Sequence, residues 1–179
     1  MRVRAIVLAG LAAAMAAGFP AAAPTLMAMD DPRAQTVAQG LAAVTDPELA
    51  RSDYVEHCAG CHGVQGVSAP ARLPELRGRV GYMMCTPDTR AYLLRLPNIA
   101  RSRLADNQEL ADMLNFMVFA IGGDSVLLGT QPFTAAEVAH ERKFALTSAS
   151  LIKERARHVE TAIRTCGAPA SLRDFYKPR

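Results

Sequence analysis

The 179-residue sequence contains no tryptophan, and neither an internal repeat nor an alternating strand pattern is apparent in it. Half of its residues are hydrophobic and 21% are charged, a balance that excludes general disorder. Residues 45–125 carry a net charge of −2 and residues 126–179 one of +4. Because neither part is strongly basic, the charge excludes a nucleic-acid footprint. The length suits one domain, or one domain with an extension.

Acidic residues are missing from the first 23 positions. Two arginines there precede an alanine-rich apolar run over residues 5–23, and small residues follow. This layout predicts a secretory signal peptide over residues 1–28. The alternative is a retained membrane anchor, although Gly10, Gly18 and Pro20 interrupt the run. We therefore expect a periplasmic or otherwise exported protein, which meets a membrane only if this segment is retained.

The rest of the chain is expected to be all-α. Pro32 and scattered polar residues favour a linker over residues 29–44. Thr134 and Glu137 have the spacing of a capping box at the start of one helix. A loop rich in glycine and proline is expected over residues 63–78. Caps and apolar periodicity predict helices over residues 45–58, 86–96, 104–123, 133–146 and 150–167.

The stretch "HCAGCHG" carries the clearest chemical signal. Cys58 and Cys61 are one helical turn apart, which suits two thioether bonds to the vinyl groups of a haem, and His62 follows to ligate the iron. A zinc site needs four ligands, usually two such pairs, and the other two cysteines are single. A redox dithiol is expected to open a helix after a strand, whereas this one closes a helix. The motif therefore predicts one covalent haem c with iron.

Residues 45–122 resemble a class I monohaem cytochrome c. The resemblance rests on "YVEHCAGCHG", on "LPELRG" in the following loop, and on "ELADMLNFM" in the last helix. It implies a small helical domain over residues 45–125, wrapped round the covalent haem, with residues 126–179 as a C-terminal helical extension. It also implies that Tyr54 and Phe116 pack where the first and last helices cross.

The same resemblance implies a role for Pro74. Its carbonyl oxygen would accept a hydrogen bond from the second ring nitrogen of His62, which fixes the tautomer of the imidazole. The alternative is that Pro74 only stiffens the loop.

The second iron ligand is not evident, because the loop "RLPNIARSRLAD" has no Met or His. That loop precedes the last helix and usually supplies a methionine in this class. Met117 is our first candidate, since it lies on the apolar face expected to touch the haem. Met113 shares that helix, whereas Met83 and Met84 are expected at the propionate edge and suit the role poorly. Each methionine can instead be a core filler. An open five-coordinate iron, or a ligand from the tail such as His140 or His158, is the remaining alternative.

Three arginines flank the haem segment, namely Arg77, Arg79 and Arg90. Because arginine binds carboxylates bidentately, we expect Arg77 and Arg79 to contact the haem propionates. The alternative for all three is a solvated surface charge.

Two cysteines remain outside the motif. In an exported chain, Cys85 and Cys166 are expected to form a disulfide that ties the tail to the core. The alternative is a pair of buried free thiols.

No nucleophile, acid–base pair or substrate motif accompanies the haem motif. The sequence therefore predicts an electron carrier rather than an enzyme, with an exported dehydrogenase as donor and an oxidase or another cytochrome as acceptor. The alternative function is a five-coordinate haem protein that binds or senses a small ligand, or has peroxidase-like activity.

Overall fold

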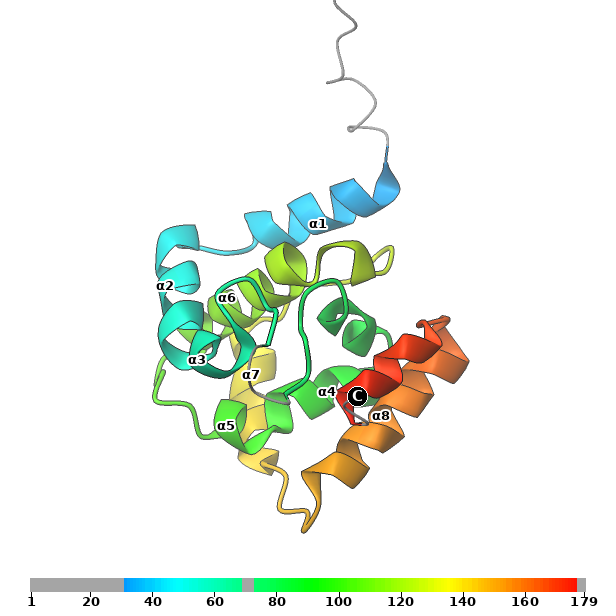
Figure 1. Ribbon diagram of the computed structural model, residues 1–179. Coiled ribbons are helices and arrows are strands. Elements are labelled where there is room, and N and C mark those ends of the chain that lie inside the picture. Colours follow the sequence, from blue (N-terminus) through cyan, green and yellow to red (C-terminus); the bar gives the residue numbers. More distant parts are fainter. Residues whose placement is uncertain (1–30, 69–72, 177–179) are drawn as a thin grey trace, which may run out of the picture.

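The computed structural model describes residues 31–68 and 73–176, so the predicted signal peptide over 1–28 lies outside the described residues. Within the described ranges every regular element is a helix, which confirms the all-α class, and none is long and apolar enough to cross a membrane (Figure 1). The elements are α1 (Pro32–Ala42), α2 (Pro47–His57), α3 (Ala59–His62), η1 (Val80–Met84), α4 (Pro87–Arg95), α5 (Pro97–Ala100), α6 (Asn107–Asn115), η2 (Phe116–Ile121), η3 (Gly123–Ser125), α7 (Ala135–Glu141), η4 (Arg142–Phe144), α8 (Leu151–Cys166) and η5 (Ala170–Phe175).

Helices α2 and α6 pack against each other. Each begins at an aspartate, Asp46 or Asp106, whose carboxylate accepts two backbone N–H groups of the first turn. Tyr54 of α2 is fully buried and meets the ring of Phe116 at a centroid distance of 5.9 Å. The two rings pack where the first and last helices of the haem-binding segment were expected to cross.

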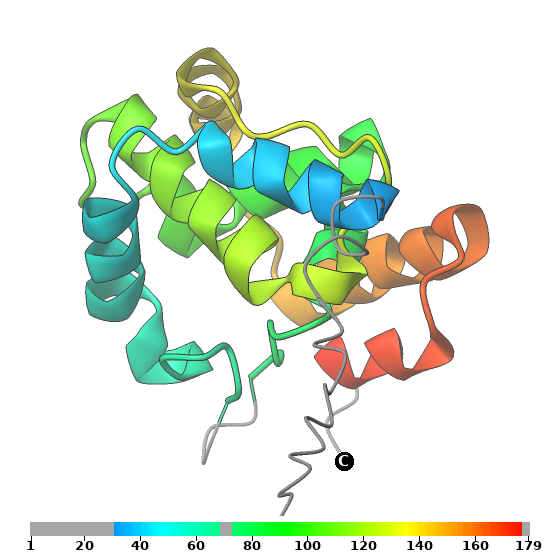
Figure 2. The same cartoon turned by 90° about the horizontal axis from the view of Figure 1, so that it is seen from above.

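Helix α1 corrects the sequence interpretation, because residues 32–42 are helical rather than a linker. The carboxylate of Asp31 accepts the backbone N–H of Arg33 at 2.9 Å, and Pro32 takes the first helical position. These two residues form a helix start, although the proline was taken as a linker signal. The helix packs on η2 (Figure 2). Gly40 lies so close to the ring of Phe119 there that a Cβ would come within 2.2 Å of it.

The helix predicted over residues 104–123 divides into two forms. It starts as α6 at Asn107 and continues as η2, a π-helical turn. The N–H of Gly122 donates to the carbonyl oxygen of Met117, five residues earlier, at 3.0 Å. One extra residue is therefore accommodated in this turn, a feature that apolar periodicity alone does not reveal.

Helix α7 is the first α-helix of the C-terminal extension and packs against α4 and α6. The hydroxyl of Thr134 accepts the N–H of Glu137, as expected for half of a capping box. The carboxylate of Glu137 does not complete the box, because it binds the guanidinium of Arg90 at 2.6 Å. Glu137 therefore forms an ion pair with α4 in place of the second hydrogen bond of the box, while the cap by Thr134 remains.

Helix α8 lies against α4 and η1, and the turn η5 packs on α8 at the end of the described chain. Ser150 caps the start of α8, and Gly167 ends the helix in the left-handed conformation, with φ at 67°. Cys166, the last residue of α8, is joined to Cys85 by a disulfide with a Cα–Cα distance of 6.1 Å. Figure 1 shows α8 and the C-terminal end of the described chain on the same side of the molecule as α4.

Candidate functional site

A cavity of about 380 Å³ lies between the haem-motif segment and the C-terminal extension. Its size falls within the range of about 300–1,000 Å³ that is usual for cofactor pockets. No aspartate or glutamate is among the described residues that line it. The lining side chains are mostly apolar: His57, Cys58, Cys61, His62, Leu73, Pro74, Leu76, Val80, Met83, Leu93, Leu96, Asn98, Ile99, Leu114, Met117, Leu151, Arg155 and Phe175.

The two cysteines of the motif sit on one helical turn at the wall of this cavity. Cys58 ends α2, and its carbonyl oxygen accepts the N–H groups of Cys61 at 3.1 Å and of His62 at 2.9 Å. Neither cysteine is in a disulfide, and Cys58 is buried whereas Cys61 is exposed. Burial, and secondarily the charge of Cys61, raise the pKa of the Cys58 thiol to about 11, so this group is protonated at neutral pH.

His62 faces the same cavity in a defined tautomer. Its Nδ1 lies 2.9 Å from the carbonyl oxygen of Pro74, the contact expected from the resemblance. Because a carbonyl only accepts, Nδ1 donates and the lone pair is left on Nε2. Burial is the main cause that lowers the pKa of His62, while the hydrogen bond to Pro74 opposes it. The neutral imidazole that results is the form that ligates metals.

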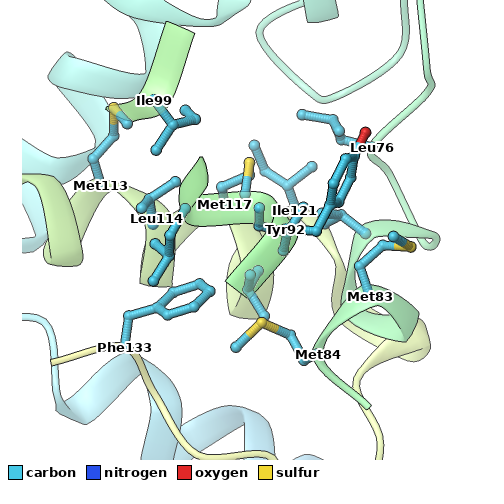
Figure 3. Packing of buried hydrophobic residues seen from close by; sticks show 14 of the residues in the cluster. Leu76, Met83, Met84, Tyr92, Ile99, Met113, Leu114, Met117, Ile121 and Phe133 are labelled. Atoms are coloured by element: carbon cyan, nitrogen blue, oxygen red, sulfur yellow. The ribbon is translucent and has the colours of Figure 1, made fainter. Parts of the chain in front are cut away.

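The four candidate methionines divide into two pairs. Met83 and Met117 line the cavity, whereas Met84 and Met113 are buried elsewhere in the core (Figure 3). Met83, which we expected at the propionate edge, lies on the turn η1 and is buried against the cavity.

The two tail histidines do not line the cavity. The side chain of His140 is 65% exposed, beside Phe144. His158 is buried and stacks on Tyr92 with a centroid distance of 4.3 Å. Neither histidine therefore reaches the cavity that His62 faces.

The arginines predicted to meet the propionates are engaged elsewhere. Arg77 donates to the backbone and side-chain oxygens of Gln65 at 2.9 and 3.0 Å. Arg79 donates to Asp174 at 3.3 Å. Neither arginine lines the cavity, because both turn to partners in the loop and in the C-terminal turn. Arg90, bound to Glu137, also lies outside it.

Sequence reasoning missed the contribution of the C-terminal extension. Leu151 and Arg155 of α8, one helical turn apart, and Phe175 of η5 all line the cavity. The disulfide expected between Cys85 and Cys166 was the one available signal, because it brings the tail next to the turn that holds Met83.

The arrangement fits a haem and does not fit a zinc ion. Of the described residues, no three from His, Cys, Asp and Glu are grouped so that they could hold a metal ion. Two thiols, one imidazole and an apolar cavity are what a covalently bound porphyrin with an axial histidine needs.

Comparison with known proteins identifies the family. The sequence is 30% identical over 127 residues to a cytochrome c-552 of Thermus thermophilus, which covers 60% of this chain and 86% of that protein. The chain belongs to the c-type cytochromes. A second cytochrome c-552 from Thermus thermophilus is 30% identical over 115 residues, with 55% of this chain and 88% of that protein covered. No protein-family model and no solved structure matches.

As a c-type cytochrome, the chain carries covalent haem c with iron, and it is an electron-transfer protein rather than an enzyme. The bound haem supplies one-electron chemistry. The protein contributes an apolar enclosure, two thiols and a neutral imidazole.

Proposed function

We propose that the chain is an exported monohaem class I cytochrome c that carries single electrons between a periplasmic dehydrogenase and a terminal acceptor, such as an oxidase or another cytochrome. The observation that carries the proposal is the convergence of Cys58, Cys61 and His62 on one apolar cavity. The layout of residues 1–28 as a signal peptide supports the export.

Each residue of the site has a role in this proposal. The thiols of Cys58 and Cys61 would hold the haem through its vinyl groups, and Nε2 of His62 would bind the iron. The carbonyl of Pro74 holds the imidazole in place through Nδ1, at 2.9 Å. Met117, which lines the cavity, would supply the second iron ligand through its thioether.

The proposed domain plan has residues 45–125 as the cytochrome domain and residues 126–179 as a helical extension, after the signal peptide and a connecting segment over 29–44. The ion pair between Arg90 and Glu137 and the disulfide at Cys166 support a fixed, rather than a free, extension.

Haem attachment can be tested with the full chain, expressed in a host that has a haem c maturation system. We expect the purified protein to be red and to keep its colour through acid–acetone extraction. A double variant, Cys58→Ala with Cys61→Ala, is expected to lose the haem and to unfold more easily, because a bound cofactor stabilises the native state. The matched control replaces Cys85 and Cys166 by alanine and should keep the haem. A colourless, folded wild-type protein that contains zinc would refute the proposal.

One observation favours a second candidate, a haem open to a small external ligand. The loop between α4 and α6 has no methionine or histidine, and its residues on the cavity are Leu96, Asn98 and Ile99. The far-red absorption band of methionine-ligated ferric haem separates the two candidates. Its presence supports the electron carrier with a thioether ligand, and its absence together with high-spin iron supports the open site.

A further inference from the structure

Arg155 is the one cavity-lining side chain, among the described residues, that carries a permanent charge. It projects from α8 of the C-terminal extension, and its Nη1 donates to the carbonyl oxygen of Phe175 at 3.1 Å. No carboxylate of the described residues forms an ion pair with it. Its charge is close enough to the motif to lower the pKa of His62, although burial contributes more.

The neighbouring arginines of the extension are neutralised locally. Arg157 lies within 3.3 Å of Asp88 and 3.2 Å of Glu154, and Arg173 lies within 2.8 Å of Glu160. Arg155 differs from both, since it faces an apolar cavity without an acidic partner. Holding a cation beside apolar surface costs free energy unless an anion compensates it.

A second polar group accompanies the guanidinium. The hydroxyl of Tyr92 is buried, and the guanidinium of Arg155 lies close enough to donate to it. Tyr92 is 3% exposed, and stacking on His158 fixes the orientation of its ring. Burial raises the pKa of Tyr92, and the guanidinium of Arg155 beside it opposes that shift. In the view of Figure 3 the hydroxyl oxygen points toward the end of the cluster where Leu76 lies, and Leu76 lines the cavity.

We propose that Arg155 and Tyr92 form the binding site for a haem propionate, so that the C-terminal extension supplies the counter-charge of the cofactor. The inference rests on the proposed haem site at Cys58, Cys61 and His62. A propionate carboxylate is anionic and accepts several hydrogen bonds, which matches the guanidinium of Arg155 on the cavity wall and the phenol of Tyr92 beside it. The disulfide between Cys85 and Cys166 links the end of α8 to the residue after η1 and so keeps the helix close to the cavity.

The pair replaces the arginines expected from the sequence. Arg77 and Arg79 are bound to Gln65 and Asp174 and lie outside the cavity lining. Arg155 stands far along the chain from the haem motif, in a segment that the family resemblance does not cover. The extension is thereby a part of the haem pocket and not an appendage to it.

The test compares four holoproteins, wild type, Arg155→Gln, Arg155→Lys and Tyr92→Phe, with Arg157→Gln as the matched control on the same helix. Two quantities are measured, the propionate bending modes in the resonance Raman spectrum and the midpoint potential. We expect Arg155→Gln and Tyr92→Phe each to shift the propionate modes. Arg155→Gln should also lower the potential, because an uncompensated carboxylate stabilises ferric iron. Arg155→Lys should lie between that variant and the wild type, and Arg157→Gln should match the wild type.

The outcomes are distinguishable. Unchanged propionate modes in Arg155→Gln and Tyr92→Phe would overturn the inference, even if the potential moves, because the charge would then act without contact. If Arg155→Gln gives no holoprotein, Tyr92→Phe and Arg155→Lys decide by the same modes. Loss of covalent haem from the wild type itself would count against the proposed function and not against this pair alone.

Discussion

His62 illustrates how single residues prepare the site before any cofactor is bound. Its pKa is lowered by burial, and its Nδ1 is occupied by the carbonyl of Pro74. Burial favours the neutral ring, and the hydrogen bond to Pro74 leaves the lone pair on Nε2, where it is available as a ligand. The orientation of the imidazole is therefore set by one contact, between His62 and the loop residue Pro74.

The second axial position gives a prediction at the residue scale. A thioether on iron stabilises the ferrous state, so Met117→Ala should lower the midpoint potential and shift the ferric spectrum toward high spin. External imidazole should also bind faster. Met84→Ala is the matched control, because Met84 is buried but does not line the cavity.

A stability measurement and a second variant complete the Met117 experiment. Thermal unfolding must accompany the spectra, since truncation of a buried methionine can cost about 2–5 kcal/mol through the cavity it leaves. If Met117→Ala folds and keeps the wild-type spectrum, Met117 is only a core residue. Met83→Ala is then the next variant, because Met83 also lines the cavity.

Helix α1 gives a prediction at the scale of elements. Gly40 has no room for a Cβ against the ring of Phe119, so Gly40→Ala should force the helix away from η2. Overpacking of this kind typically costs about 1–3 kcal/mol. Chemical denaturation of the holoprotein measures the loss. Gln39→Ala, at an exposed position of the same helix, should change the stability little, and equal stabilities of the two variants would show that α1 does not dock as described.

His158 of helix α8 predicts how the stability of the folded state depends on pH. Burial, and then the charge of Arg157, lower the pKa of His158 below its usual value of 6.5. The folded state therefore binds this proton less readily than the unfolded state, and its stability is retained above pH 6.5 and lost as the pH falls below it. The melting temperature of the holoprotein should fall between about pH 7.5 and about pH 5, and His158→Phe should make that fall shallower. His140→Phe, at an exposed position, should follow the wild type.

The elements that the sequence predicted well carry their own local signals. Asp46, Thr86 and Ser150 cap helices close to the expected positions, and Pro97 follows the end of α4. Helix α1 was missed because Pro32 signals a helix start as well as a linker. The π-turn at Phe116–Ile121 was missed because an extra residue leaves the apolar pattern nearly intact.

The residues of the site also divide into those that the sequence signalled and those that it did not. Cys58, Cys61 and His62 lie within five residues, so the motif and its spacing were enough to propose them, and the resemblance to class I cytochromes c implied the role of Pro74. Arg155 and Tyr92 meet only after α8 folds onto α4, a tertiary contact that has no periodic or motif signature. Arg77 and Arg79 were chosen for their closeness in sequence to the motif, and the structure turns both toward other partners.

At the scale of the whole molecule, the disulfide joins the residue after η1 to the last residue of α8. Cys85 and Cys166 are 81 residues apart in the sequence. In the chain-entropy model, a link across a loop of that length stabilises the native state by roughly 4–5 kcal/mol. Peptide mapping without reduction should recover the two cysteines in one linked pair. The variant Cys85→Ala with Cys166→Ala should keep its haem but unfold at lower denaturant, and alkylation of both thiols before reduction would contradict the link.

The wall that α8 adds to the cavity has a consequence in time. About a hundred residues separate His62 from Cys166, and at a synthesis rate of about 5–20 residues per second they emerge roughly 5–20 s apart. During that interval the two motif cysteines are present, whereas the wall that Leu151, Arg155 and Phe175 supply is not yet made. The cavity is therefore complete only after the last residues have folded onto the rest, and a chain that ends early would keep the haem motif and lack this wall.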